Sequence, residues 1–155
     1  MFSSDTKAPG EPAPEFTLEN QRGELVSLAE LRGKHNIVLF FYPKDDTPVC
    51  TQEACLFRDN YERMKEADAV VFGISSDSKE SHRAFAERHG FPFDLLTDHD
   101  GSVRKAYGIS KTLGVLPGRV TFVIDRGGII RRVISSQLSA SKHVNEALQA
   151  LERLA

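Results

Sequence analysis

The chain has 155 residues, and its 20 basic and 22 acidic side chains leave a formal net charge of −2 at pH 7. This near-balance gives no electrostatic reason to expect binding to nucleic acid or to a membrane surface. No apolar run approaches the ~20 residues of a membrane-spanning helix, and the polar N-terminus has no signal-peptide core. We therefore expect a single domain over 1–155 with a loose arm over 1–12, in the cytoplasm, or in an organelle lumen if the chain is a processed form.

The first regular elements are predicted to be extended. Two short strands, at 15–18 and 24–26, flank an Asn-Gln-Arg-Gly turn, which predicts an N-terminal β-hairpin. One helical turn is expected at 27–30. The segment 36–42 is apolar throughout, which is typical of a strand covered on both faces.

A helix is predicted directly after this strand. Pro43 ends the strand, Thr47 is a candidate N-cap, and Pro48 suits the first helical position, where its missing N–H costs nothing. Apolar residues then recur at steps of four and three, which predicts a helix over 48–66. The members of this stripe are Cys50, Ala54, Phe57, Tyr61 and Met64.

The rest of the chain alternates between strands and helices. In order, we expect a strand at 70–74, a helix from a capping box at 77–80 to about His89, a strand at 93–96, a short helix at 102–107, a loop at 109–118, strands at 119–124 and 128–133, and a C-terminal amphipathic helix. An Asp-Arg-Gly-Gly turn joins the last two strands as a hairpin. This order predicts an α/β fold with parallel crossovers first and an antiparallel hairpin later.

The two cysteines of the chain, Cys50 and Cys55, fall in the same predicted helix. Cys50 is expected in its first turn, where unpaired backbone N–H groups favour a thiolate. Apolar surroundings oppose this, so a nearby cation is needed, and Arg119 is a candidate. In an intact helix the two Cα atoms would lie about 8.6 Å apart, beyond the ~6.8 Å limit of a disulfide. The spacing therefore favours a reversible redox pair, whose disulfide requires local unwinding, over a permanent structural bond.

These residues carry a family resemblance. The motif Pro43-x-x-x-Thr47-x-x-Cys50 resembles the active-site signature of peroxiredoxins. The longer run at 41–55, Phe-Tyr-Pro-Lys-Asp-Asp-Thr-Pro-Val-Cys-Thr-Gln-Glu-Ala-Cys, is similar to the peroxiredoxin Q, or bacterioferritin comigratory protein, subfamily. Val49 replaces the subfamily's usual Gly, and Leu56 stands where a small or polar residue is common. The resemblance covers nearly the whole chain and implies a thioredoxin-like fold, with a central mixed sheet flanked by helices.

The resemblance also implies an activity. It points to a thiol-dependent peroxidase that reduces hydrogen peroxide and organic hydroperoxides, in antioxidant defence and redox homeostasis. Cys50 would be the peroxidatic cysteine, which becomes a sulfenic acid, and Cys55 the resolving cysteine of an intramolecular disulfide. Thr47 and Arg119 would bind the peroxide, and thioredoxin or a similar dithiol would reduce the disulfide. No metal, haem or flavin is implied, and subfamily habit favours a monomer.

Several alternatives stay open at this point. Glu53 either faces solvent in the first helical turn, where its charge favours the helix dipole, or orients Arg119. Pro43 and Tyr42 would shape the pocket wall, with Pro43 shielding the thiolate, but Tyr42 also fits the core. The five histidines are scattered and predict no zinc site. A peroxide sensor or disulfide relay is also compatible with the motif, whereas a thioredoxin-like reductase is disfavoured because Cys-x-x-Cys is absent.

Overall fold

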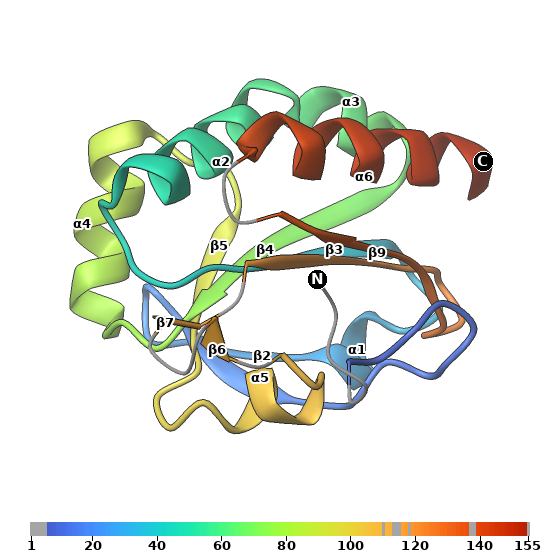
Figure 1. The fold of residues 1–155 in the computed structure, drawn as a ribbon, viewed down its shortest axis with the longest axis horizontal. Helices are drawn as coiled ribbons and strands as arrows, with labels where there is room; N and C mark the ends of the chain where they lie inside the picture. Colours follow the sequence, from blue (N-terminus) through green and yellow to red (C-terminus); the bar gives the residue numbers. More distant parts are fainter. Residues whose placement is uncertain (1–5, 110, 113–115, 118, 137–138, 155) are drawn as a thin grey trace.

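A seven-stranded mixed sheet runs through the molecule (Figure 1). The computed structural model describes residues 6–109, 111–112, 116–117, 119–136 and 139–154. The strands of the sheet are β1 (Thr17–Asn20), β2 (Leu25–Ser27), β3 (Asn36–Phe41), β4 (Ala69–Ser75), β5 (Asp94–Thr97), β8 (Val120–Ile124) and β9 (Ile130–Ser135), in the spatial order β2-β1-β5-β4-β3-β8-β9. The inner strands β3, β4 and β5 are parallel, and the outer pairings are antiparallel. The predicted α/β fold with a thioredoxin-like mixed sheet is confirmed.

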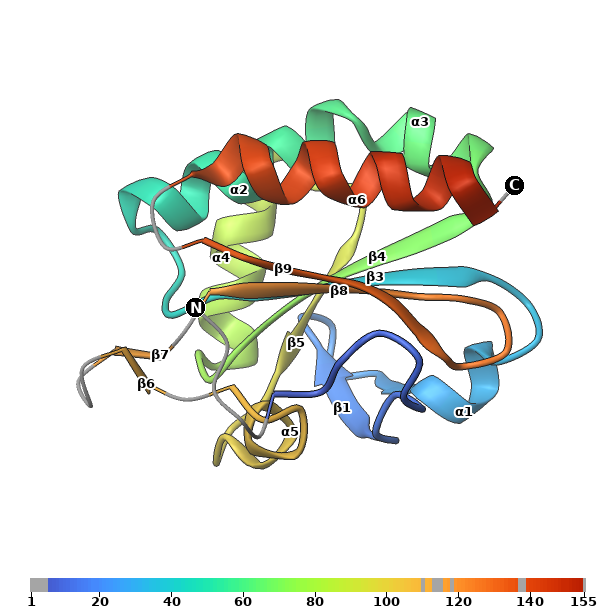
Figure 2. The same ribbon diagram turned by 45° about the vertical axis from the view of Figure 1, so that its right-hand side comes forward.

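Helices cover both faces of this sheet (Figures 1 and 2). On one face lie α2 (Pro48–Asp59), α3 (Tyr61–Glu66) and α6 (Ala140–Leu154), and the side chains of α4 (Lys79–His89) share their core. On the other face lie α1 (Leu28–Leu31) and α5 (Ser102–Ala106). The N-terminal hairpin β1–β2 forms as predicted. The result is a three-layer arrangement in which β3 is an inner strand, between β4 and β8.

Strand β3 is buried along its whole length because both of its faces are covered. Val38 and Phe40 point into the core beneath α2 and α6. Ile37, Leu39 and Phe41 point into the opposite core. The uninterrupted apolar run therefore reflects period-two alternation between two separate cores, as the sequence predicted.

The helix that was predicted over 48–66 is interrupted at Asn60, so this prediction is wrong in part. Asn60 has φ −107° and ψ 10°, and α2 ends and α3 begins on either side of it. Its side-chain amide donates to the carbonyl oxygen of Leu56 at 2.8 Å. Asparagine competes with helical hydrogen bonds in this way, which explains the break. The apolar stripe continues across it, since Met64 of α3 is buried in the same core as Cys50.

The predicted capping box of α4 is also wrong, because the N-cap is Ser78 and not Asp77. The Ser78 hydroxyl accepts the backbone N–H of Ser81 at 3.1 Å. Asp77 instead accepts the backbone N–H of Asp45 at 2.8 Å and the hydroxyl of Ser75 at 2.7 Å. The carboxylate of Asp77 is therefore hydrogen-bonded to the loop that contains Asp45, and it does not cap α4.

Two segments are more ordered than the sequence indicated. Part of the predicted loose arm, residues 6–12, is bound to the body: Lys7 donates its N–H to the Tyr107 carbonyl at 3.0 Å, and Gly10 to that of Ile130 at 2.7 Å. The predicted loop at 109–118 contains a small antiparallel pair, β6 (Lys111–Thr112) and β7 (Leu116–Pro117). The remaining parts of both predictions, residues 1–5, 110, 113–115 and 118, lie outside the described residues.

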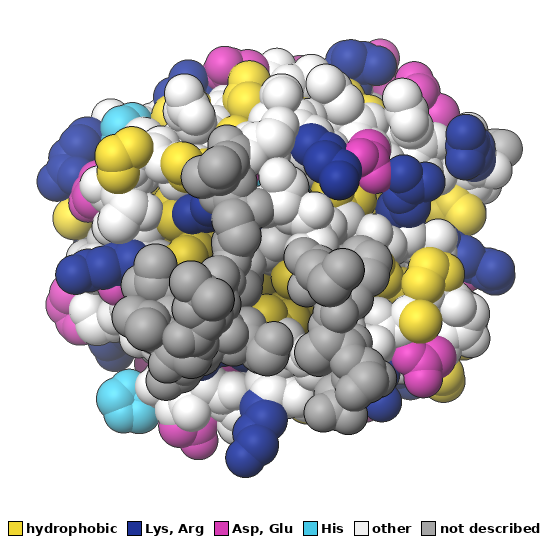
Figure 3. Space-filling model, viewed as in Figure 1, with side chains coloured by type: hydrophobic (Ala, Val, Ile, Leu, Met, Phe, Trp, Pro, Cys, Tyr) yellow, Lys and Arg dark blue, Asp and Glu magenta, His cyan; other side chains and the backbone are white. Residues whose placement is uncertain are grey.

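The surface is charged with both signs. On the face drawn in Figure 3, basic and acidic side chains are interspersed, in agreement with the near-zero net charge. Within the part of the chain that the structure describes, no helix combines the length and apolar character required to cross a bilayer.

Candidate active site

Cys50 lies in the first turn of α2, with Thr47 at the N-cap position and Pro48 as the first helical residue. Its side chain is 1% exposed, because it belongs to the stripe that packs α2 against β3. The first-turn N–H groups of a helix have no intrahelical partner and favour a negative charge. The sulfur of Cys50 therefore lies where the sequence predicted, after the strand and the proline turn and at the start of the helix.

Arg119 contacts that sulfur directly. Its Nη2 donates to Cys50 Sγ at 3.0 Å, and the side chain is only 7% exposed. The two residues are distant in sequence, and the sheet brings them together: β8 pairs with β3 so that Val120 lies opposite Phe41. Arg119 therefore stands beside the point where β3 turns toward α2. A guanidinium carries a permanent charge and a fixed fork of donors, so it stabilises a thiolate and can still donate to a second acceptor.

Glu53 is buried one turn after Cys50, and the solvent-facing alternative is therefore wrong. Its side chain is 0% exposed, and its Oε1 lies 3.8 Å from Arg119 Nε. Burial raises the pKa of Glu53 to about 8, although the charge of Arg119 acts in the opposite direction. At neutral pH this carboxyl is mostly protonated, so it does not cancel the charge of Arg119 that faces the sulfur.

Two further residues, His143 and Thr121, lie next to Glu53 and were not predicted from the sequence. His143 of α6 is completely buried; its Nδ1 lies 2.7 Å from Thr121 Oγ1 and 3.3 Å from Glu53 Oε2, and its Nε2 lies 2.8 Å from the Ser136 carbonyl oxygen. Burial lowers the pKa of His143 to about 4, so the ring is neutral. A carbonyl only accepts, which puts the proton on Nε2 and leaves Nδ1 to accept from the Thr121 hydroxyl. Among the described residues, neither oxygen of Glu53 has a hydrogen-bond partner.

No sequence signal marked His143 as part of this group. It lies in the first turns of an amphipathic helix, where the apolar stripe explains burial without assigning a partner. Thr121 carried a weak signal, since it follows Arg119 by two residues and thus shares its side of an extended chain.

Thr47 occupies the N-cap position without capping the helix. Its hydroxyl donates to the Lys44 carbonyl oxygen at 2.9 Å, so the predicted capping hydrogen bond does not form. The side chain is half-buried, and its oxygen keeps lone pairs that can accept a hydrogen bond.

The remaining candidates divide between core and helix surface. Tyr42 is buried in the same core as Cys50, and its hydroxyl donates to Asp45 Oδ1 at 2.6 Å, which matches the core alternative. Pro43 is half-buried at the end of β3. Cys55 is half-buried, and both cysteines are free thiols within the uninterrupted helix α2. A Cys50–Cys55 disulfide therefore requires this helix to open.

Known proteins resemble this chain in sequence. A model of the AhpC/TSA family matches residues 9–133. The chloroplastic peroxiredoxin Q of Sedum lineare is 47% identical over 155 residues, which cover 99% of this chain and 82% of the relative. That of Triticum aestivum is 46% identical over 146 residues, which cover 94% and 67% respectively.

Solved structures resemble it in fold. Peroxidoxin BcpB from Mycobacterium tuberculosis superposes with a TM-score of 0.88 at 38% identity, over 95% of this chain and 97% of that one. A structure of the bacterioferritin comigratory protein of Xanthomonas campestris, described in terms of its alkyl peroxide reduction activity, gives 0.83 at 30% identity, over 90% and 91%. The similarity thus extends over nearly the whole chain in both sequence and fold.

Proposed function

Because this chain belongs to the AhpC/TSA family and is a thiol-dependent peroxidase of the peroxiredoxin Q type, we propose that Cys50 is the sulfur that attacks the peroxide. The observation that carries this proposal is the 3.0 Å contact between Arg119 Nη2 and Cys50 Sγ in a buried helix start. A permanent cation in contact with a sulfur stabilises its thiolate, which is the nucleophilic form.

The first step oxidises Cys50. Its thiolate attacks one oxygen of the hydroperoxide, an S–O bond forms, and the O–O bond breaks. Cys50 becomes a sulfenic acid, and the other oxygen takes up a proton and leaves as water or an alcohol. Arg119 and the N–H groups of the helix start stabilise the charge on the leaving oxygen. Since the Thr47 hydrogen is engaged by Lys44, the Thr47 oxygen accepts from the peroxide O–H and fixes its orientation.

The second step forms a disulfide. The start of α2 opens, the Cys55 thiolate attacks the Cys50 sulfenic acid, the S–O bond breaks, and the oxygen leaves as water. Both cysteines are then oxidised in one intramolecular disulfide, which an external dithiol reduces by thiol–disulfide exchange. Glu53 acts as a positioning residue behind Arg119, and Pro43 shields the sulfur from water.

The partners are a hydroperoxide and a thiol reductant. We propose that the reductant is thioredoxin or a similar dithiol protein and that the protein acts as a monomer. The cytoplasmic location stays a prediction, and the organelle alternative gains support from the relatives named as chloroplastic. A compartment with a dithiol-reducing system suits the proposed cycle in either case.

The cycle predicts a different product for each cysteine variant. With thioredoxin, thioredoxin reductase and NADPH, the wild-type protein is expected to consume many peroxides per molecule. Cys55→Ser should react once and hold a sulfenic acid, detected by mass spectrometry after trapping with dimedone, because its resolving thiol is missing. Cys50→Ser should not react. Equal turnover in Cys55→Ser would contradict the resolving role, and turnover in Cys50→Ser would contradict the proposal as a whole.

The same assay separates the peroxidase from the alternative sensor or relay. A peroxidase turns over with thioredoxin, thioredoxin reductase and NADPH as the only other proteins and reductant, whereas a relay is oxidised once and is not reduced until its client protein is added. A stoichiometric burst without turnover, combined with mixed disulfides to a single client, would favour the relay.

Disulfide formation should also unwind part of α2. We expect amide exchange to rise in residues 48–56 of the oxidised protein and far-UV helix signal to fall, because the two cysteines are too far apart in an intact helix. The strands β3 and β4 should keep their protection and serve as the internal control. Identical exchange at 48–56 in both redox states would exclude the unwinding step.

A further inference from the structure

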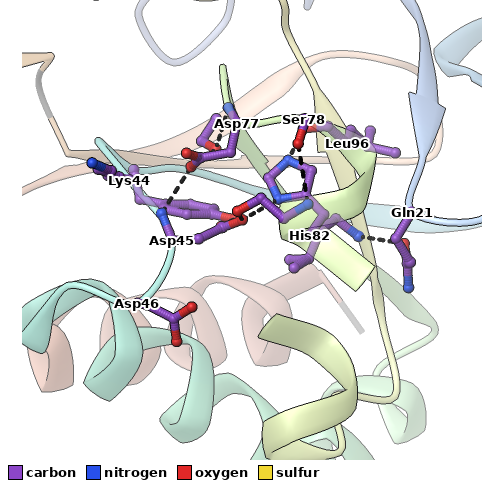
Figure 4. Close-up of polar contacts among 12 residues, drawn as sticks. Gln21, Lys44, Asp45, Asp46, Asp77, Ser78, His82 and Leu96 are labelled. Carbon is purple, nitrogen blue, oxygen red and sulfur yellow. Dashed lines mark hydrogen bonds and ion pairs between the residues drawn. The ribbon is translucent and has the colours of Figure 1, made fainter. Parts of the chain in front are cut away.

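A buried polar cluster lies behind the loop that joins β3 to α2 (Figure 4). Its centre is the carboxylate of Asp45, which is 5% exposed. Asp45 Oδ1 accepts from the Tyr42 hydroxyl at 2.6 Å, and Oδ2 accepts from the Ser81 hydroxyl at 2.9 Å and lies 2.8 Å from Nδ1 of His82. Figure 4 shows Asp45 between Asp77 and His82, while the neighbouring Asp46 points away from them. The catalytic cycle described above uses none of these contacts.

The hydrogen bonds of His82 define the protons of this cluster. The imidazole is 0% exposed, and its Nε2 lies 3.1 Å from the carbonyl oxygen of Leu96. Because a carbonyl only accepts, Nε2 carries a proton, and one further proton is shared between Nδ1 and Asp45 Oδ2. The two side chains joined in this way form a buried pair in which each polar atom has a partner.

The cluster ties the loop to three separate elements of the fold. The Asp45 side chain reaches Ser81 and His82 of α4, and its backbone N–H donates to Asp77 Oδ2 at 2.8 Å, at the end of β4. His82 in turn reaches the end of β5 through Leu96. The attachments are thus to the first turns of α4 and to the carboxyl ends of β4 and β5. Asp45 itself lies two residues before Thr47.

We propose that Asp45 and His82 are positioning residues that hold the peroxide-binding loop at Thr47 in its reactive place. The inference rests on the proposed function, since it assigns these residues a role through Thr47. The pair acts on the loop from its N-terminal side, and none of its side chains belongs to α2. It can therefore stay intact while the start of α2 unwinds, and it defines the fixed end of the segment that moves.

Asp45, Asp77 and His82 also have the right residue types and spacing for a metal site. The hydrogen bonds argue for an anchor instead. Both oxygens of Asp45 already accept from protein donors, and Nδ1 of His82 faces one of them across a shared proton. A cation would have to displace these contacts.

The test measures the first chemical step alone, in a Cys55→Ser background. Two rate constants of Cys50 are compared: that with hydrogen peroxide, which requires a positioned substrate, and that with iodoacetamide, which requires only an accessible thiolate. Asp45→Ala is expected to lower the peroxide rate constant by on the order of tenfold to 100-fold, the scale of a misplaced reactant, and to leave the iodoacetamide rate constant unchanged. Asp45→Asn keeps an acceptor for Tyr42 and a partner for a neutral His82, so it should recover most of the peroxide rate.

Two milder variants keep the inference testable if Asp45→Ala does not fold. Ser81→Ala removes one donor to Asp45, whereas Ser78→Ala removes the N-cap of the same helix without touching Asp45. Only Ser81→Ala should slow the peroxide reaction. Equal peroxide rates for these two variants, or an Asp45→Ala protein that folds and reacts as fast as the Cys55→Ser parent, would overturn the inference. A parent that fails to react with peroxide would instead refute the role proposed for Cys50, so the two failures are distinguishable.

Discussion

Replacing Arg119 with methionine is expected to lower the rate constant of Cys50 with hydrogen peroxide by on the order of 10²- to 10³-fold, the usual cost of removing one preorganised donor. The variant loses the donor that lies 3.0 Å from the sulfur, together with the permanent charge that stabilises a thiolate. Stopped reactions followed by mass spectrometry of the oxidised Cys50 peptide would measure this constant.

Two further arginine variants separate charge from geometry. Arg119→Lys keeps a charge but loses the planar fork, so its rate should fall between those of wild type and Arg119→Met. Arg131→Met removes a half-exposed arginine of β9 that pairs with Asp125, and it should leave the rate unchanged. A wild-type rate for Arg119→Met would remove the basis of the proposed mechanism.

Glu53 should make the folded protein less stable as the pH rises from about 5 to 8. Its pKa rises from 4.5 in its ordinary state to about 8 in the fold because of burial. Between these values the folded state holds a proton that the unfolded chain has lost, so the free energy of unfolding decreases with rising pH. Glu53→Gln is neutral throughout, and its stability advantage over wild type should grow by a few kcal/mol over this range, at about 1.4 kcal/mol per unit of pKa shift.

Urea unfolding of the reduced proteins, followed by far-UV circular dichroism at several pH values, would test this. Glu62→Gln is the matched control, since Glu62 lies on α3 with its side chain 84% exposed. His143 contributes in the opposite sense, because its pKa in the fold lies below its ordinary value. The folded protein therefore loses stability as the pH falls from 6.5 toward 4. Because His143 contacts Glu53, the comparison is made above pH 7, where the imidazole is mostly neutral in both the folded and the unfolded protein. A difference between Glu53→Gln and wild type that does not change with pH would show that Glu53 is ionised in the fold.

Local patterns predicted the secondary structure well where one physical signal dominated. The apolar run of β3, the proline turn and the helix start around Cys50 each depend on neighbours within a few residues, and all lie where predicted. The failures occurred where two local signals competed. Asn60 lies within the predicted helical segment, but its side-chain amide donates to the backbone carbonyl of Leu56. Asp77 fits the N-cap pattern, but its carboxylate accepts the backbone N–H of Asp45 instead. A pattern of residue types cannot rank such alternatives, because their energies differ by little more than one hydrogen bond.

By itself, the sequence determined the fold class, the helix start at Cys50 and the conflict between an intact helix and a Cys50–Cys55 disulfide, because these follow from the periods of strands and helices. Only the tertiary structure decided which distant groups meet. The register of β8 on β3 sets Arg119 against the sulfur, the packing of α6 buries His143 beside Glu53, and the packing of α4 joins His82 to Asp45. Such contacts depend on the relative placement of whole elements, and that placement is decided by burying both faces of the sheet at once.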